Sequence, residues 1–157
     1  MKAVFVRTMN GMIEDKDDLI AEYKQIIRRL TDHAALNLEA KQQTEEVHVL
    51  TELIRRCVAE NATTPQYQEV YAERYKVLKA RYEAATQRLK QIEDQRAERK
   101  QRRQKMLEFI RMLEKADGVL TEFDEGVWNT TVETVTVQVD GSMVFRWKNG
   151  TETTVNI

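Results

Sequence analysis

The hydrophobic period of this chain changes once, and that change constrains its fold more than any other feature. Through most of the first 116 residues, apolar side chains recur at alternating spacings of three and four, as on a helix with one buried stripe. In the last 25 residues or so they fall on every second position, as in strands with one apolar face. The sequence therefore predicts an α+β fold, mostly α, in which a long antiparallel helical coiled-coil hairpin precedes a short helix and a small three-stranded antiparallel meander.

Three long helices are expected, at about residues 2–31, 33–60 and 65–116. The first stripe begins with Phe5, Met9 and Met12, and a short strand at Ala3–Val6 is the alternative for its start. The second helix ends before Pro65, which suits the first turn of the third helix, with Thr64 as its cap. We expect residues 1–118 to form the coiled-coil arm and residues 119–157 to form the short helix and meander.

The third expected helix is too long to bury its stripe against itself. A tight turn at residues 61–64 makes the second helix its natural antiparallel partner, although a homodimer that buries the same stripes is an alternative. The residues expected at this coiled-coil interface are Val47, Leu50 and Ile54 on one helix, and Tyr71, Tyr75, Leu78, Tyr82 and Leu89 on the other.

A basic stretch interrupts the stripe of the third helix. Residues 96–105 hold six basic side chains and one glutamate, and Arg96, Arg99 and Arg103 occupy stripe positions where apolar residues are expected. Two interpretations stay open: a solvated stretch where the hairpin loosens, or a basic surface that faces DNA phosphates or an acidic protein. The candidate DNA contacts are Arg99, Lys100, Arg102 and Arg103, together with Arg146 and Lys148 on the sheet.

The end of the chain can be predicted in more detail. Apolar residues occupy odd positions: Val135, Val137, Val139, Met143, Phe145, Trp147, Val155 and Ile157. Two-residue turns at the Asp-Gly and Asn-Gly pairs would split this face, because they pair odd positions with even ones. Three-residue loops with Gly141 and Gly150 in the left-handed conformation keep the face together, pairing 137 with 143 and 145 with 153. A short helix beginning at Thr121, with Asp124 as a capping-box-like partner, should cover the sheet through Phe123, Val127 and Trp128.

Groups for catalysis are scarce. Ser142 is the only serine, Cys57 the only cysteine, and His33 and His48 lack the spacing of a metal-binding pair. We therefore expect no enzyme activity, no metal site and no cofactor in this chain. The net charge of −1 argues against a generic nucleic-acid binder. The sequence has no run of 18 apolar residues, so we expect no membrane span. A soluble, cytoplasmic protein is expected.

Four segments carry a resemblance to a known family: AEYKQIIRRLTD (Ala21–Asp32), ELIRRCVAENA (Glu52–Ala62), LTEFDEGVW (Leu120–Trp128) and VTVQVDGSMVFRWKNGTE (Val135–Glu152). Together they resemble the C-terminal region of large serine recombinases, the site-specific integrases of mobile elements, over nearly the whole chain. The resemblance implies the coiled-coil arm and the closing strands of the zinc-ribbon domain. It implies contact with other recombinase subunits during synapsis and support of DNA binding, with the catalytic serine and the zinc elsewhere in the parent protein.

The chain departs from the family pattern at two points. The zinc-binding cysteines are absent, and Gly126 stands where a helix-favouring residue is expected. A free-standing coiled-coil adaptor that binds another protein is therefore the alternative function.

Overall fold

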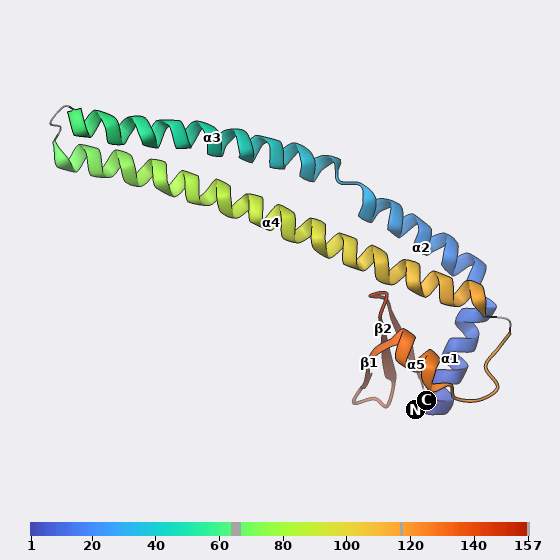
Figure 1. The fold of residues 1–157 in the computed structure, drawn as a ribbon. Coiled ribbons are helices and arrows are strands. Elements are labelled where there is room, and N and C mark those ends of the chain that lie inside the picture. Colours follow the sequence, from blue (N-terminus) through green and yellow to red (C-terminus); the bar gives the residue numbers. More distant parts are fainter. Residues whose placement is uncertain (64–66, 117, 157) are drawn as a thin grey trace. The chain divides into compact units, whose positions relative to one another are not determined.

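The structure, a computed structural model, describes residues 1–63, 67–116 and 118–156. Long helices precede a three-stranded antiparallel sheet, which confirms the predicted mostly-α α+β fold (Figure 1). The helices are α1 (Lys2–Glu14), α2 (Lys16–Thr31), α3 (Ala34–Thr63), α4 (Gln68–Lys115) and α5 (Glu125–Thr131). The strands are β1 (Val132–Val137), β2 (Met143–Trp147) and β3 (Glu152–Val155). No helix in the described ranges is long and apolar enough to cross a membrane.

The chain forms two compact units that do not follow the expected boundary at residue 118. Unit 1 joins Met1–Thr31 to Glu98–Ile157, and unit 2 is Asp32–Ala97. Helix α4 contributes residues to both units, because its C-terminal turns pack against the sheet. The first 31 residues and the end of α4, expected in the arm, thus belong to the same unit as the meander.

The N-terminal segment is two helices where one was expected over residues 2–31. α1 ends at Asp15, whose backbone has φ −95° and ψ 18°, and α2 begins at the next residue with a marked bend (Figure 1). Backbone hydrogen bonds from Asp15 N to Gly11 O (3.0 Å) and from Leu19 N to Asp15 O (3.1 Å) carry the chain through this bend. Aspartate favours such non-helical geometry because its side chain competes for backbone groups. The alternative strand at Ala3–Val6 is wrong, since those residues are helical.

The next helix boundary has a local cause. Asp32 lies between α2 and α3 and its Oδ1 accepts a hydrogen bond from Ala34 N (3.1 Å), which satisfies a free donor at the start of α3. α3 runs three residues beyond the expected end at residue 60. The expected cap Thr64 and the expected first-turn residue Pro65 lie outside the described residues.

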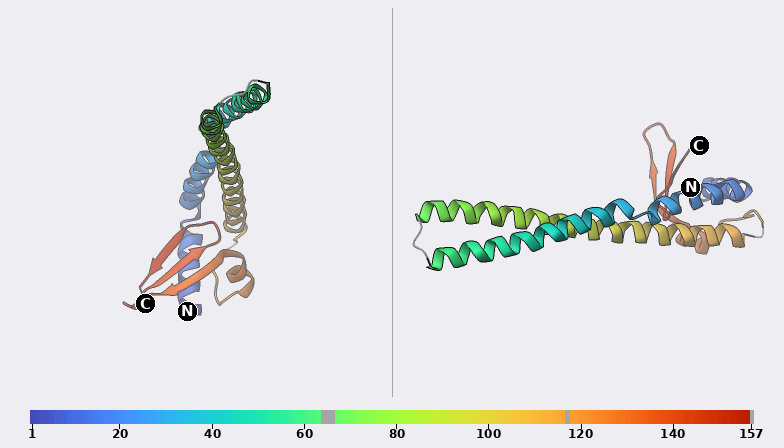
Figure 2. Two further views of the ribbon diagram at one scale, coloured as in Figure 1. Left: turned by 90° about the vertical axis from the view of Figure 1, so that its left-hand side faces the viewer. Right: turned by 90° about the horizontal axis from the view of Figure 1, so that it is seen from above.

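The meander has the predicted register. β1, β2 and β3 are neighbours in that order (Figure 2). Val137 lies opposite Met143, and Phe145 lies opposite Thr153. Gly141 and Gly150 both have φ +86°, so each three-residue loop places its glycine in the left-handed region, as expected. Gly141 N donates to Gln138 O (3.0 Å) and Gly150 N to Trp147 O (2.8 Å), which closes the loops.

The core of unit 1 lies between the sheet and helices that come from three parts of the chain. Fully buried Phe5 and Met9 of α1 and Leu113 of α4 pack with Phe145 and Trp147 of β2. Phe123, Val127 and Trp128 pack against this core, as expected. The apolar face differs from the prediction at one end, since Val137 and Val139 are exposed. Val132, at an even position, is buried because the register shifts between it and Thr134.

Helix α5 begins later than expected. Asp124 is itself the N-cap, in extended conformation, and its carboxylate accepts from Val127 N (2.9 Å). Thr121 and Glu122 precede the helix. The capping carboxylate of Asp124 also lies close to Gly126, because a Cβ added to Gly126 would be 3.1 Å from Asp124 Oδ1. Glycine here leaves room for the cap.

Candidate interaction surfaces

The hairpin of unit 2 pairs α3 with residues 68–97 of α4 along one antiparallel seam within a single chain (Figure 1). Leu50 on α3 and Leu78 on α4 are buried at its centre with Cys57. The other expected seam residues in this cluster are partly buried: Ile54, Tyr71, Tyr75 and Tyr82. Val47 and Leu89 lie on the same stripes and are partly buried outside the cluster.

Ion pairs cross the seam at one heptad position of each helix. With Leu50 and Leu78 at position d of heptads lettered a–g, the partners occupy position g: Glu39 with Arg88, Glu46 with Arg81, and Glu60 with Arg74. Arg88 binds Glu39 through two nitrogens, at 2.5 and 2.9 Å. From the first pair to the second, α3 advances one heptad and α4 goes back one heptad, which is the register of an antiparallel coiled coil.

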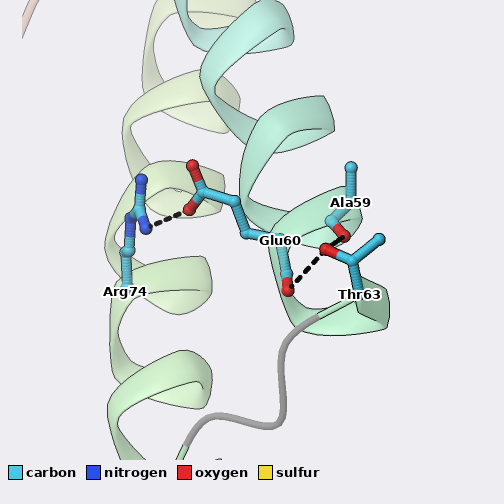
Figure 3. Close-up of polar contacts among 4 residues, drawn as sticks. All are labelled: Ala59, Glu60, Thr63 and Arg74. Carbon is cyan, nitrogen blue, oxygen red and sulfur yellow. Dashed lines mark hydrogen bonds and ion pairs between the residues drawn. The ribbon is translucent and has the colours of Figure 1, made fainter.

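The last pair departs from this register. By heptad count Arg74 is level with Leu53, but its Nη1 donates to Glu60 Oε2 (2.8 Å), one heptad closer to the end of α3 (Figure 3). Thr63 Oγ1 donates to the carbonyl oxygens of Ala59 (3.1 Å) and Glu60 (3.3 Å) in the same turn. The final turn of α3 is thus held to α4 by the Glu60–Arg74 pair, and the Thr63 hydroxyl caps backbone carbonyls within the same turn.

The two-nitrogen pair changes the titration of both partners. The hydrogen bond between Arg88 and Glu39 lowers the pKa of the Glu39 carboxyl and raises the pKa of the Arg88 guanidinium. Because solvent screens such exposed pairs, they contribute little to stability, and their main effect is on register and on the charge of the surface.

The arginines at stripe positions have different surroundings. Arg96 is partly buried, forms an ion pair with Glu93, and donates to Asn37 Oδ1 of α3 (2.5 Å). Asn37 thus gives the Arg96 charge a partner across the seam. Arg99 is partly buried and Arg103 is exposed, both in the part of α4 that belongs to unit 1.

One basic residue of α4 lies against the β2–β3 loop in unit 1. Lys100 and Arg102 are exposed on α4, and Arg102 lies against the β2–β3 loop: a Cβ at Gly150 would be 3.7 Å from Arg102 Nε. Lys148, in that same loop, is exposed and its Nζ donates to Asn129 O. Arg146 instead pairs with Glu152 on the neighbouring strand (2.9 Å). The arrangement brings Arg102 beside the Lys148 loop and gives Arg146 an acidic partner.

Both loops of the meander use the same side-chain hydrogen bonds, which the sequence interpretation missed. Asp140 Oδ1 accepts from Ser142 N (2.9 Å) and Oγ (2.7 Å), and Asn149 Oδ1 accepts from Thr151 N (2.9 Å) and Oγ1 (2.7 Å). The hydrogen bonds from Ser142 lower the pKa of Asp140. The signal is the shared pattern Asp/Asn-Gly-Ser/Thr. Ser142 therefore has a structural partner in the loop.

Groups that could support chemistry are dispersed. Within the described ranges, no three His, Cys, Asp or Glu side chains come together in a way that could hold a metal ion. Cys57 is a buried free thiol in the seam, His48 is exposed, and His33 is partly buried beside the start of α3. A cleft of about 530 Å³ in unit 1, between α1, α2 and β3, is lined by Arg7, Asp15, Glu22 and Glu152 among apolar side chains. Comparison with known proteins found no matching family model, curated sequence or solved structure.

Proposed function

We propose that this chain is a protein-contact module without chemistry of its own, in which the helical hairpin of unit 2 binds another protein molecule. One observation carries this proposal. The seam of the hairpin is filled by residues of the same chain, and yet large apolar side chains remain exposed on both helices. Val70 is 62% exposed, Val77 and Val49 are each 50% exposed, and Tyr67, which precedes α4, is 87% exposed. Several exposed large apolar side chains on one hairpin are typical of a surface that a partner covers.

Photo-crosslinking in cells that express the whole chain tests this function. A photoreactive amino acid at Val77 should form covalent adducts with a protein. The same residue at Lys79, which is exposed two positions further along α4 and points to the other side of the helix, is the matched control. Adducts from both positions, or from neither, would reject the hairpin as a specific contact element.

The first setting for this module is the C-terminal region of a large serine recombinase, where it would serve subunit contact and synapsis and would support DNA binding. The sequence of the α5–meander segment supports this setting, and so does the proximity of Arg102 to the Lys148 loop. Its partners would be other recombinase subunits and, through the parent protein, DNA. The parent's catalytic serine and zinc would lie in other domains.

DNA binding by the purified chain tests the basic surface. Fluorescence anisotropy with a labelled duplex at several salt concentrations should give a slope of log affinity against log salt that falls by about 1–2 in the Arg102→Glu/Lys148→Glu variant. Lys76→Glu/Lys79→Glu, at two exposed positions of unit 2, changes the net charge by the same amount and is the matched control. An unchanged slope, or a wild-type chain that does not bind the duplex, would remove DNA contact from this surface.

The second setting is a free-standing adaptor, and a separate observation favours it. Phe5, Phe109 and Leu113 from the helices cover the buried residues of β2 within this chain. Closing strands of a zinc-ribbon domain would instead be expected to pack on the rest of that domain. In the adaptor setting the chain does not bind DNA, so the anisotropy experiment separates the two settings.

A further inference from the structure

The two broad faces of the unit 2 hairpin differ in composition. In an antiparallel coiled coil, positions g and c of both helices share one face, and positions e and b share the other. The ion pairs at position g identify the first face. Four large apolar residues stand on it, Val49, Val70 and Val77 at position c and Tyr67 at position g, and partly buried Leu53 lies among them. We call these five residues the valine face.

The opposite face is mostly charged. Its exposed members at positions e and b include Lys41, Arg55, Lys76, Lys79, Glu83 and Lys90, with one exposed large apolar residue, Val58. The ion pairs Glu39–Arg88 and Glu46–Arg81 set the antiparallel register, and in this register Val49 lies within about one residue of the level of Val77. Val49 borders the face on the α3 side, and Val70 and Val77 border it on the α4 side, so the face has an apolar margin along each helix.

Charge at position g is divided between the two helices, although exposed Arg56 at position c adds one basic residue on α3. The acidic residues at position g, Glu39, Glu46 and Glu60, all belong to α3, and the basic ones, Arg74, Arg81 and Arg88, all belong to α4. Each hairpin thus presents an acidic row beside a basic row, with apolar residues on either side.

We propose that the valine face binds a second copy of this chain, in a two-fold dimer whose hairpins run parallel. A two-fold axis along the hairpins places α3 of one copy over α4 of the other, so that acidic rows face basic rows and Val49 lies level with the partner's Val77. The antiparallel alternative places α3 over α3 and sets acidic rows against each other, which is unfavourable. The proposal rests on the proposed function, in which the hairpin is the contact element, and it specifies the partner.

The size of the face agrees with this assignment. α3 has 30 residues, so the hairpin is about 45 Å long, and two helices about 10 Å wide make it about 20 Å across. Such a face offers about 900 Å² per copy, close to the roughly 800 Å² per partner of a stable interface.

Sedimentation equilibrium of the purified full chain tests the partner. The wild-type chain should sediment as a dimer, and Val49→Glu/Val77→Glu should raise the dimer dissociation constant by at least about tenfold, because it places charges where Val49 meets the partner's Val77. Val58→Glu, on the opposite face, should leave the dissociation constant unchanged. Far-UV circular dichroism shows whether each variant keeps its helices, and Val49→Ser/Val77→Ser replaces the double glutamate if that variant unfolds. A monomeric wild-type chain at about 100 μM, or equal effects on both faces, would overturn the proposal.

Distances between spin labels test the orientation. In a Cys57→Ala background, a label at Lys41→Cys or at Thr63→Cys reports the distance to the same site in the partner. These residues lie about 33 Å apart along α3. A parallel dimer gives short distances at both sites, whereas an antiparallel dimer cannot, because shortening one distance lengthens the other. A monomeric chain that forms Val77 crosslinks to a different protein would overturn the second-copy partner and leave the proposed function standing.

Discussion

The ring of Phe5 packs edge-on against the indole of Trp128, with ring centroids 5.0 Å apart and an interplanar angle of 69°. Phe5 belongs to α1 and Trp128 to α5, so this contact joins two helices separated by most of the sequence. Phe5 also lies 6.5 Å from Phe145 and 6.4 Å from Trp147, measured between ring centroids. The first helix is thus an integral part of the sheet core.

Replacement of Phe5 by alanine should destabilise unit 1 strongly. Phe5 is fully buried, and large-to-small changes at such aromatic positions cost about 3–5 kcal/mol of unfolding free energy. Phe5→Leu, which keeps most of the volume, should cost less. Urea unfolding followed by tryptophan fluorescence measures both, since Trp128 and Trp147 lie in this core. Val119→Ala is the control, because Val119 is half exposed. If Val119→Ala lowered the unfolding free energy as much as Phe5→Ala, that result would contradict the assigned core.

Two glycine-to-alanine changes should act in opposite directions. Gly11 lies inside α1, and a methyl group there would meet no neighbouring atom within 4 Å, so alanine should stabilise the helix by about 0.5–1 kcal/mol. Gly150 also has room for a methyl, but its φ of +86° strains any other L-residue, so alanine should destabilise by about 1 kcal/mol. Thermal unfolding of the two variants measures the change in stability of each. If both changes had the same sign, the space around the glycine, and not its backbone conformation, would determine the effect of alanine.

The stability of the hairpin should depend on the ionisation of Glu39. Its pKa is lowered in the folded chain by the hydrogen bond to Arg88, so the stabilisation is present above the unfolded pKa of about 4 and is lost as pH falls through the folded value. Glu39→Gln should therefore be less stable than wild type at pH 7, and the difference should disappear near pH 2. Urea unfolding across this range measures it. A difference that persists at pH 2 would have another source than the ion pair.

The thiol of Cys57 should report opening of the hairpin. Cys57 is 1% exposed in the seam, so a thiol reagent can reach it only when the helices separate. Tyr71→Ala, which removes a neighbour in the same cluster, should speed the labelling. Lys90→Ala should not, because Lys90 is exposed on α4, on the face opposite the valine face. Rapid labelling of the wild-type chain, as fast as in urea, would contradict the buried position of this thiol.

Local rules predicted the meander better than the packing around it. The parity of Met143, Phe145 and Trp147, taken with Gly141 and Gly150, gave the correct loops, because side-chain alternation and turn length constrain each other. The same parity failed at Val132, because a register shift in the strand is invisible in the spacing of apolar residues.

The sequence did not predict which elements distant along the chain pack against each other. The stripe of Phe5, Met9 and Met12 indicates that one face of α1 is buried, but the same spacing fits a coiled coil and a sheet-covering helix equally well. Six of the eight expected seam residues share one cluster in the hairpin, since heptad phase and antiparallel pairing follow from one period, whereas Val47 and Leu89 lie outside that cluster. The pairing of Arg96 with Asn37, and the position of Arg102 beside Gly150, depend on tertiary structure.

The one-heptad step between the Glu39–Arg88 and Glu46–Arg81 pairs makes the length of the hairpin a modular quantity. Removing one heptad from α3 and the facing heptad from α4 would delete a layer of the seam and one ion pair together. The phase of both helices would be preserved, and every residue of the unit 1 core would remain. Hairpins of different reach can thus arise from this chain by paired insertions or deletions of seven residues, while the meander and its covering helices stay unchanged.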